Sequence, residues 1–311
     1  MLENYRSSDT EIRVEPRNRF VFVCGLHRSG TSLIAKSLAQ HPLASGFSGT
    51  GEIEDEGQFL QTVLPLEIEF GGVGRFGFDA RAHMTEGSHI NNPANASRLF
   101  EEWSRHWDIS KPLLIEKTPS NLLRMRLLNR LLSPSFFIVV TRHPVAAALA
   151  TMKWTEGNLF GLLYHWVHCY RIARADAAQL ENVLWVSYES LVADPVKTLS
   201  RIARFLDLRA SEGWPSSLEN ANRKYFTQWQ TDYHGDWNRT IAQLPPEMPR
   251  SIIRRVKDRI TRDRLERSLP AYRQAHRRKG FRDAQDAASL LESEIATFGY
   301  SFYDLTKSPV W

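Results

Sequence analysis

Three cationic side chains follow short apolar runs of the sequence, and the first lies in a loop bounded by two glycines. The run Phe-Val-Phe-Val-Cys ends at Gly25, and the loop that follows places Arg28 in front of a helical pattern beginning at Thr31. Lys117 and Arg142 stand at the ends of two later apolar runs. A glycine-bounded loop and a helix N-terminus present N–H groups that bind anions, and fixed cations strengthen that binding. These residues predict a phosphate-binding site.

The segments that carry these cations alternate between apolar runs and helical patterns. The apolar runs lie at residues 19–25, 112–117, 135–141 and 182–187. Strands that alternate with helices predict an α/β fold, in which a central parallel β-sheet is flanked by helices. Ligands of such sheets bind at the carboxyl ends of the strands. Ser187 and Tyr188 stand at the fourth of these ends, next to the position expected for the cations.

The pattern changes after about residue 214, where the chain becomes helical and basic. We expect a flexible arm followed by one domain with a helical C-terminal extension. The expected boundaries are 1–18 for the arm and 19–311 for the domain, with an α/β core at 19–214 and a basic helical part at 215–311.

Composition limits the partners without naming one. The net charge is +5, which favours acidic partners such as phosphates, sulfates or nucleic acid. The N-terminus is polar and no apolar run approaches the ~18 residues of a membrane span, so we expect a cytoplasmic protein. Cys24 and Cys169 are expected to be buried free thiols.

The loop at residues 25–30 differs from the loop of nucleotide triphosphatases. The spacing of its two glycines fits the pattern G-x-x-x-x-G-K-[ST], but Thr31 occupies the lysine position. An ATP-dependent small-molecule kinase with an altered loop therefore remains as an alternative, although no strand ends in an obvious aspartate for Mg²⁺. A non-catalytic binder of nucleotides or nucleic acid is a further alternative. Too few aromatic residues accompany the basic tail to favour nucleic acid.

The segment GLHRSGTSLIAKSLAQHP resembles the 5′-phosphosulfate loop of sulfotransferases that use 3′-phosphoadenosine 5′-phosphosulfate (PAPS). Three later segments resemble further motifs of this family, in the family's order: EKTPSN, FFIVVTRHPVAAALA and VSYESLVADPVKTLSRIARFLDL. The four matches cover roughly residues 19–208, and NRKYFTQW and FGYSFYDL resemble weaker landmarks near the C-terminus. The resemblance is to the bacterial-type and tyrosylprotein-sulfotransferase-like branch. It implies a fold related to that of the P-loop nucleotide triphosphatases.

The family resemblance implies transfer of a sulfuryl group from PAPS to a hydroxyl or amine acceptor by in-line displacement, which releases 3′,5′-adenosine bisphosphate. No metal is expected, because fixed cations suffice for a sulfuryl group, which carries less charge than a phosphoryl group. Arg28 is implied at the 5′-phosphate and the transferring group, Lys117 at the leaving oxygen and Arg142 at the 3′-phosphate. The other implied nucleotide contacts are Ser29, Gly30, Thr31, Ser32, Tyr188, Asn222, Tyr225, Trp229, Arg278 and Lys279. The acceptor, whether a small molecule, carbohydrate, lipid or peptide, is not readable.

A general base must remove the proton of the acceptor. In the related branch a glutamate lies shortly after the first helix, and by position Glu56 fits best, with Glu54 second and His27 as a rival base. Two departures weaken the match to the family's 3′-phosphate pocket. Ala150 stands where the family often has a serine, and Ser187 where it has an arginine.

Overall fold

The computed structural model describes residues 18–155, 157–211, 213–233 and 270–311, with side chains in the last range given from residue 282 onward. The N-terminal arm expected at 1–18 lies outside these residues except for Asn18. The Asn18 Nδ2 group donates hydrogen bonds to the carbonyl oxygens of Ile109 and Lys111.

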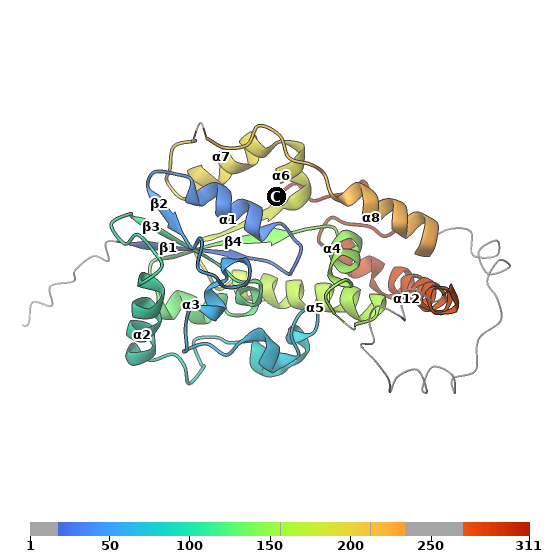
Figure 1. Ribbon diagram of the computed structural model, residues 1–311, viewed down its shortest axis with the longest axis horizontal. Helices are drawn as coiled ribbons and strands as arrows, with labels where there is room; N and C mark the ends of the chain where they lie inside the picture. Colours follow the sequence, from blue (N-terminus) through green and yellow to red (C-terminus); the bar gives the residue numbers. More distant parts are fainter. Residues whose placement is uncertain (1–17, 156, 212, 234–269) are drawn as a thin grey trace, which may run out of the picture.

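Five parallel strands form one sheet at the centre of the molecule (Figure 1). Their order across the sheet is β2-β3-β1-β4-β5. The strands span Arg19–Cys24 (β1), Ala44–Gly46 (β2), Leu113–Lys117 (β3), Ser135–Thr141 (β4) and Val183–Ser187 (β5). Four of them occupy the apolar runs of the sequence, which confirms the prediction of an α/β fold with a central parallel sheet.

Helices cover both faces of this sheet. The helices are α1 (Thr31–Ala39), α2 (Pro93–Ser104), α3 (Met125–Leu131), α4 (Pro144–Thr151), α5 (Leu159–Ala177), α6 (Tyr188–Ala193), α7 (Pro195–Phe205), α8 (Asn222–Gln228) and α12 (Pro270–Ala296). Figure 1 shows α1, α6 and α7 on one side of the sheet and α2, α3 and α5 on the other. The result is a three-layer arrangement of helix, sheet and helix.

The core follows from the alternation of side chains along each strand. In β1, Val21 and Val23 face the layer of α1 and α7, whereas Phe20, Phe22 and Cys24 face the other layer. Both faces are apolar because both are covered, as a parallel sheet requires. Cys24 and Cys169 are buried free thiols, as expected.

The C-terminal part packs on the same core. Helix α12 lies beside α5. Its residues Ala284 and Ile295, and Phe298 after it, belong to the apolar cluster on the face of the sheet that Phe20, Phe22 and Cys24 occupy. The Arg174 guanidinium donates a hydrogen bond to the carbonyl oxygen of Thr297. This contact joins the end of α12 to α5.

Two segments adopt structures that were not predicted from sequence. The segment 57–70 was not assigned from sequence, and it contains two short 3-10 turns, Gly57–Phe59 and Glu67–Phe70. Strand β2 was not predicted, because its three residues, Ala-Ser-Gly, have no strand propensity of their own. Pairing with β3 is what makes this segment a strand.

Candidate active site

The order of the strands brings the three cations to one edge of the sheet. Strand β1 lies between β3 and β4, and its residue Val23 is in register with Lys117 at the end of β3. Arg142 directly follows β4 on the other side of β1. The loop after β1 therefore lies between Lys117 and Arg142. This is the switch point of the sheet, because the strands that follow β1 in sequence lie on both sides of it. This is where ligands bind in open α/β sheets.

Gly30 shapes the loop at the start of α1. It is the N-cap of α1 with φ of 98°, a left-handed conformation that suits glycine, and its carbonyl oxygen accepts from the Leu33 amide. A Cβ atom at this position would lie 2.8 Å from Cδ2 of Tyr188. Glycine is therefore required both by the turn and by the close approach of the tyrosine ring.

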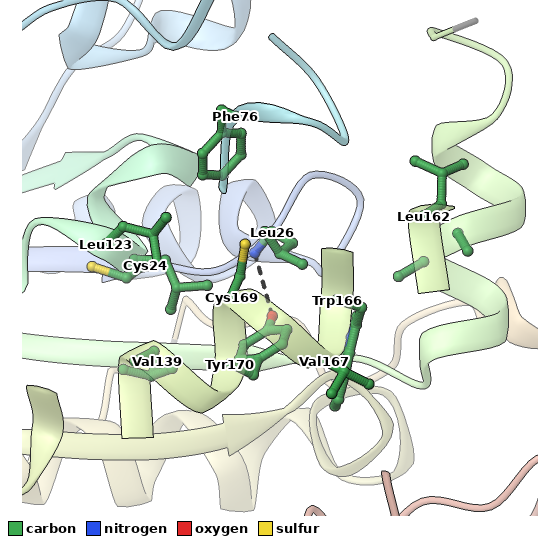
Figure 2. Packing of buried hydrophobic residues seen from close by; sticks show 14 of the residues in the cluster. Cys24, Leu26, Phe76, Leu123, Val139, Leu162, Trp166, Val167, Cys169 and Tyr170 are labelled. Carbon is green, nitrogen blue, oxygen red and sulfur yellow. Dashed lines mark hydrogen bonds between the residues drawn. The ribbon is translucent and has the colours of Figure 1, made fainter. Parts of the chain in front are cut away.

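Tyr170 of α5 supports the loop from below (Figure 2). Its hydroxyl accepts a hydrogen bond from the Leu26 amide at 3.3 Å and donates one to the carbonyl oxygen of Val140 at 2.6 Å. The Ser29 hydroxyl also lies 3.3 Å from it. A single buried hydroxyl thus joins the loop to the end of β4. Sequence analysis missed Tyr170, since an aromatic residue in an apolar helix carries no signal of such a role.

Ser29 does not fit the nucleotide contact that was implied for it. The side chain is fully buried against Tyr170, and its amide donates to the carbonyl oxygen of Leu26 at 3.1 Å. Both donors of Ser29 are used inside the loop. We therefore correct this assignment and regard Ser29 as a residue that fixes the loop.

A cavity of about 430 Å³ opens above the loop and contains most of the candidate residues. Arg28, Lys117 and Arg142 line it together, although they come from three separate segments. The remaining lining residues are His27, Gly30, Thr31, Ser32, Leu33, Ile53, Glu54, Glu56, Phe59, Glu67, Val73, Pro119, Thr151, Trp154, Tyr188 and Ala221. The cavity is large enough for a small-molecule ligand.

Arg142 is a buried residue of the cavity lining. Its Nε donates to Oδ1 of Asn222 at 2.7 Å and its Nη1 to the carbonyl oxygen of Arg28 at 2.6 Å. The Nη2 group has no hydrogen-bond partner among the described residues. The ring of Tyr188 lies 4.3 Å from the guanidinium carbon. Burial lowers the pKa of Arg142, and a buried donor without a partner is costly unless a ligand accepts from it.

Lys117 and Glu56 form a buried ion pair in the lining of the cavity. The Nζ of Lys117 lies 3.0 Å from Oε1 of Glu56, and Oε2 of Glu56 accepts from Nε2 of Gln58 at 2.7 Å. Glu54, the second candidate base, also lines the cavity but is exposed, and it accepts from the Ser32 hydroxyl at 3.3 Å. The two candidate carboxylates thus differ in position, and only Glu56 contacts a cation of the cavity.

A second carboxylate–base pair lines the same cavity. The Nε2 of His27 lies 3.0 Å from Oε1 of Glu67, a residue that sequence analysis did not single out. The neighbouring Glu116 is buried directly before Lys117, and burial raises its pKa to about 7. Burial also lowers the pKa of Arg124 to about 10, and the charges of Glu67 and Glu116 oppose this shift. Charged groups are therefore buried close to Lys117 and Glu67, two residues of the cavity lining.

Arg28 and Trp154 form an exposed part of the cavity lining. Arg28 has φ of 65° and is exposed, and its guanidinium carbon lies 5.8 Å from the centre of the Trp154 ring. Trp154 is 67% exposed, which is unusual for a tryptophan of a globular protein. The pair leaves the Arg28 guanidinium free of carboxylates within the described chain.

Two other implied nucleotide contacts do not line the cavity, and the side chains of two more are not described. Trp229 is buried and stacks on Phe302, so it belongs to the core rather than to the cavity lining, and we correct that assignment. Tyr225 does not line the cavity either, but its ring lies 5.6 Å from the Arg142 guanidinium. Arg278 and Lys279 are part of α12, and their side chains lie outside the described residues.

The two departures from the family pattern have structural explanations. Ala150 is buried in α4, and the next residue, Thr151, lines the cavity in its place. Ser187 is the N-cap of α6, where its hydroxyl accepts from the Ser190 amide at 3.1 Å. The Thr151 hydroxyl is therefore available at the cavity. Ser187, at the position where the family has an arginine, caps α6 instead.

Two kinds of feature are absent from the described residues. No group of three or more His, Cys, Asp or Glu side chains there is arranged to hold a metal ion. None of the helices within the described ranges has the length and apolar character needed to cross a membrane.

Comparison with known proteins identifies the family. A sequence model described as "Sulfotransferase family" matches residues 21–212. Similar solved structures include the sulfotransferase domain of the curacin biosynthetic pathway, at 18% identity over 63% of this chain and 76% of that chain, with a TM-score of 0.42. The sulfotransferase domain of the Synechococcus PCC 7002 olefin synthase is 21% identical over 85% of this chain and 94% of that chain, with a TM-score of 0.40. Mouse sulfotransferase SULT7A1 complexed with PAP is 14% identical over 83% of this chain and 87% of that chain, with a TM-score of 0.35. Among curated proteins, none matches. The family match spans more than half of the sequence and includes the loop and all three cations, and the chain therefore belongs to the sulfotransferase family.

Proposed function

We propose that this sulfotransferase takes a sulfuryl group from PAPS and transfers it to a hydroxyl or amine acceptor by in-line displacement. The observation that carries the proposal is the convergence of Arg28, Lys117 and Arg142 on one cavity at the switch point of the sheet. A nucleotide with phosphate groups at both ends of its ribose needs separated cations. Arg28, Lys117 and Arg142 come from three separate segments and line one cavity, which supports that arrangement.

The residues fit the two phosphate-bearing ends of PAPS differently. The buried Nη2 of Arg142, without a partner in the described chain, suits the 3′-phosphate, because a guanidinium presents a planar fork to a phosphate. Arg28 and the N-terminus of α1, with Gly30, Thr31 and Ser32, suit the 5′-phosphosulfate. Tyr188 lies between the two, with its ring against both Gly30 and Arg142.

Transfer breaks the bond between sulfur and the bridging oxygen of PAPS and forms a bond from sulfur to the acceptor oxygen or nitrogen. In our proposal Lys117 turns toward the bridging oxygen and stabilises the negative charge that develops there. This movement releases Oε1 of Glu56, which then removes the proton of the acceptor. The products are the sulfated acceptor and 3′,5′-adenosine bisphosphate. Glu54 and the His27–Glu67 pair are the alternative bases.

The alternatives from sequence analysis receive less support. A kinase would need a cation at position 31, where the structure has Thr31 at the start of α1. Family membership likewise favours sulfuryl transfer over a role as a non-catalytic binder of nucleotides or nucleic acid. The acceptor is proposed to bind beside Ile53, Phe59 and Val73, which are apolar residues of the cavity lining.

The proposal is tested with radiolabelled PAPS and a panel of phenols, sugars, amines and tyrosine peptides. We expect enzyme-dependent release of 3′,5′-adenosine bisphosphate and label on an acceptor, both lost in Lys117→Ala. Phosphorylation of any acceptor from ATP·Mg²⁺, without use of PAPS, would contradict the proposal and support the kinase alternative.

A further inference from the structure

Arg142 is held in place by neutral groups rather than by a carboxylate. Its Nε donates to the Asn222 side chain and its Nη1 to a backbone carbonyl. No carboxylate of the described chain comes within 4.0 Å of it. A direct ion pair would neutralise the guanidinium and occupy the fork that a phosphate needs. The present arrangement leaves both the charge and the Nη2 group available.

The carboxylate of Glu189 is nevertheless linked to Arg142 indirectly, through the side chain of Asn222. Oε1 of Glu189 accepts from Nδ2 of Asn222 at 2.6 Å and from the His143 amide at 3.0 Å. Oε2 of Glu189 accepts from the Tyr300 hydroxyl at 3.0 Å. Burial raises the pKa of Tyr300, so this hydroxyl keeps its proton and remains a donor. Each oxygen of Glu189 is thus occupied by donors from separate segments of the chain.

The orientation of the Asn222 amide follows from this contact. An ionised carboxylate only accepts hydrogen bonds, so Asn222 must present its NH₂ group to Glu189. Its oxygen is then directed to Nε of Arg142, which only donates. The two hydrogen bonds therefore run in the same direction: Arg142 donates to Asn222, and Asn222 donates to Glu189. It also places a negative charge near the buried arginine without covering the face that lines the cavity.

We propose that Glu189 is a positioning residue of the nucleotide site, which orients Arg142 toward the 3′-phosphate through Asn222. The inference rests on the proposed function, in which Arg142 binds that phosphate. It gives the C-terminal segment a part in nucleotide binding, because Tyr300 holds both Glu189 and the hydroxyl of Thr141, the residue directly before Arg142. Glu189 acts at a distance from the reacting atoms, and its effect is confined to one end of the nucleotide.

The test compares the dissociation constants of 3′,5′-adenosine bisphosphate and AMP, which differ by the 3′-phosphate. In Glu189→Gln the amide can donate to Asn222 and allow it to turn, so that Arg142 meets a donor instead of an acceptor. Hydrogen bonds to charged groups have strengths that correspond to tenfold or more in affinity. We expect the preference for the bisphosphate over AMP to fall about tenfold or more, while AMP binding changes less than about twofold.

Glu292→Gln is the matched control. Glu292 also anchors the C-terminal segment, since it accepts from the Ser301 hydroxyl and the Phe302 amide, but it has no contact with Asn222 or Arg142. We expect this variant to keep the wild-type preference. A wild-type preference in Glu189→Gln would overturn the inference. No preference in the wild-type protein would overturn the proposed function as well, so the two failures are distinguishable.

Asn222→Ala provides a second route if Glu189→Gln does not fold. It removes the acceptor of Arg142 Nε directly, and we expect the same loss of preference for the bisphosphate. Where all variants fold, the losses in Glu189→Gln and Asn222→Ala should not add in the double variant, because both act through one chain of contacts. Additive losses, or an unchanged preference in Asn222→Ala, would overturn the inference.

Discussion

The ion pair between Lys117 and Glu56 makes a prediction that separates binding from chemistry. Glu56→Gln keeps the shape of the side chain and its neighbour Gln58, but it removes the negative charge that lies 3.0 Å from the Lys117 ammonium. Without nucleotide, the variant leaves a buried ammonium without its partner. With nucleotide, the leaving oxygen of the bisphosphate takes the place of Glu56, so the loss should be partly restored.

The magnitudes follow from the burial of the pair. Breaking a fully buried pair costs roughly 3–5 kcal/mol, and because this pair borders an open cavity we expect a smaller loss of about 1–3 kcal/mol in the free energy of unfolding. The bisphosphate no longer competes with Glu56 for Lys117, so its affinity should rise about tenfold, or about 1.4 kcal/mol. The transfer rate should fall about 10²–10⁴-fold, since the base is lost.

The assay is chemical unfolding with and without saturating 3′,5′-adenosine bisphosphate, followed by the rate of transfer from PAPS. Glu52→Gln, an exposed glutamate of the same segment, is the control and should match the wild-type protein in all three quantities. A Glu56→Gln variant that transfers at the wild-type rate would refute Glu56 as the base. A variant that the bisphosphate stabilises less than it stabilises the wild-type protein would refute the competition for Lys117.

Three further predictions concern Gly30 and Tyr170, which shape and support the loop, and the buried carboxyl of Glu116. Gly30→Ala places a Cβ 2.8 Å from Tyr188 at a φ of 98°, so we expect stability to fall by about 1–3 kcal/mol in urea unfolding, together with weaker bisphosphate binding by calorimetry. Tyr170→Phe leaves the Leu26 amide without its acceptor, and it should cost about 1–3 kcal/mol; an unchanged unfolding midpoint would contradict the support assigned to this hydroxyl. Burial raises the pKa of Glu116 from 4.5 to about 7, so the folded state holds a proton that the unfolded state has already released in this range. The contribution of Glu116 to stability is therefore greatest below pH 4.5 and is lost as the pH rises through about 7, and urea unfolding across this range should show a fall on the order of 1–3 kcal/mol that Glu116→Gln abolishes.

The sequence predicts those parts of the molecule in which local pattern and tertiary structure agree. The loop before Thr31 and the strands that end near Lys117 and Arg142 are apolar runs with clear limits, and the sheet order then brings them together. The carboxyl ends of parallel strands share one edge, so residues placed there from sequence meet in space. Glu56, whose role as the base stays a prediction, also lines the cavity and pairs with Lys117.

Other features depend on contacts between distant segments, which local pattern does not reveal. Tyr170 reaches the loop from α5, and Glu67 joins His27 from a turn whose conformation the sequence did not indicate. Trp229 was expected at the nucleotide, but stacking on Phe302 from the C-terminal segment places it in the core. Aromatic side chains are used both in cores and in binding sites, so their type alone does not distinguish the two.

The most direct test of the proposed function is the affinity of the wild-type protein and of Arg142→Ala for 3′,5′-adenosine bisphosphate, AMP, ADP and ATP·Mg²⁺, measured by calorimetry. We predict that the wild-type protein binds the bisphosphate most tightly and that Arg142→Ala loses this preference, because a guanidinium–phosphate contact with one buried donor is removed. Tightest binding of ATP·Mg²⁺, or a preference for the bisphosphate that survives in Arg142→Ala, would contradict the assignment of the cavity as a PAPS site.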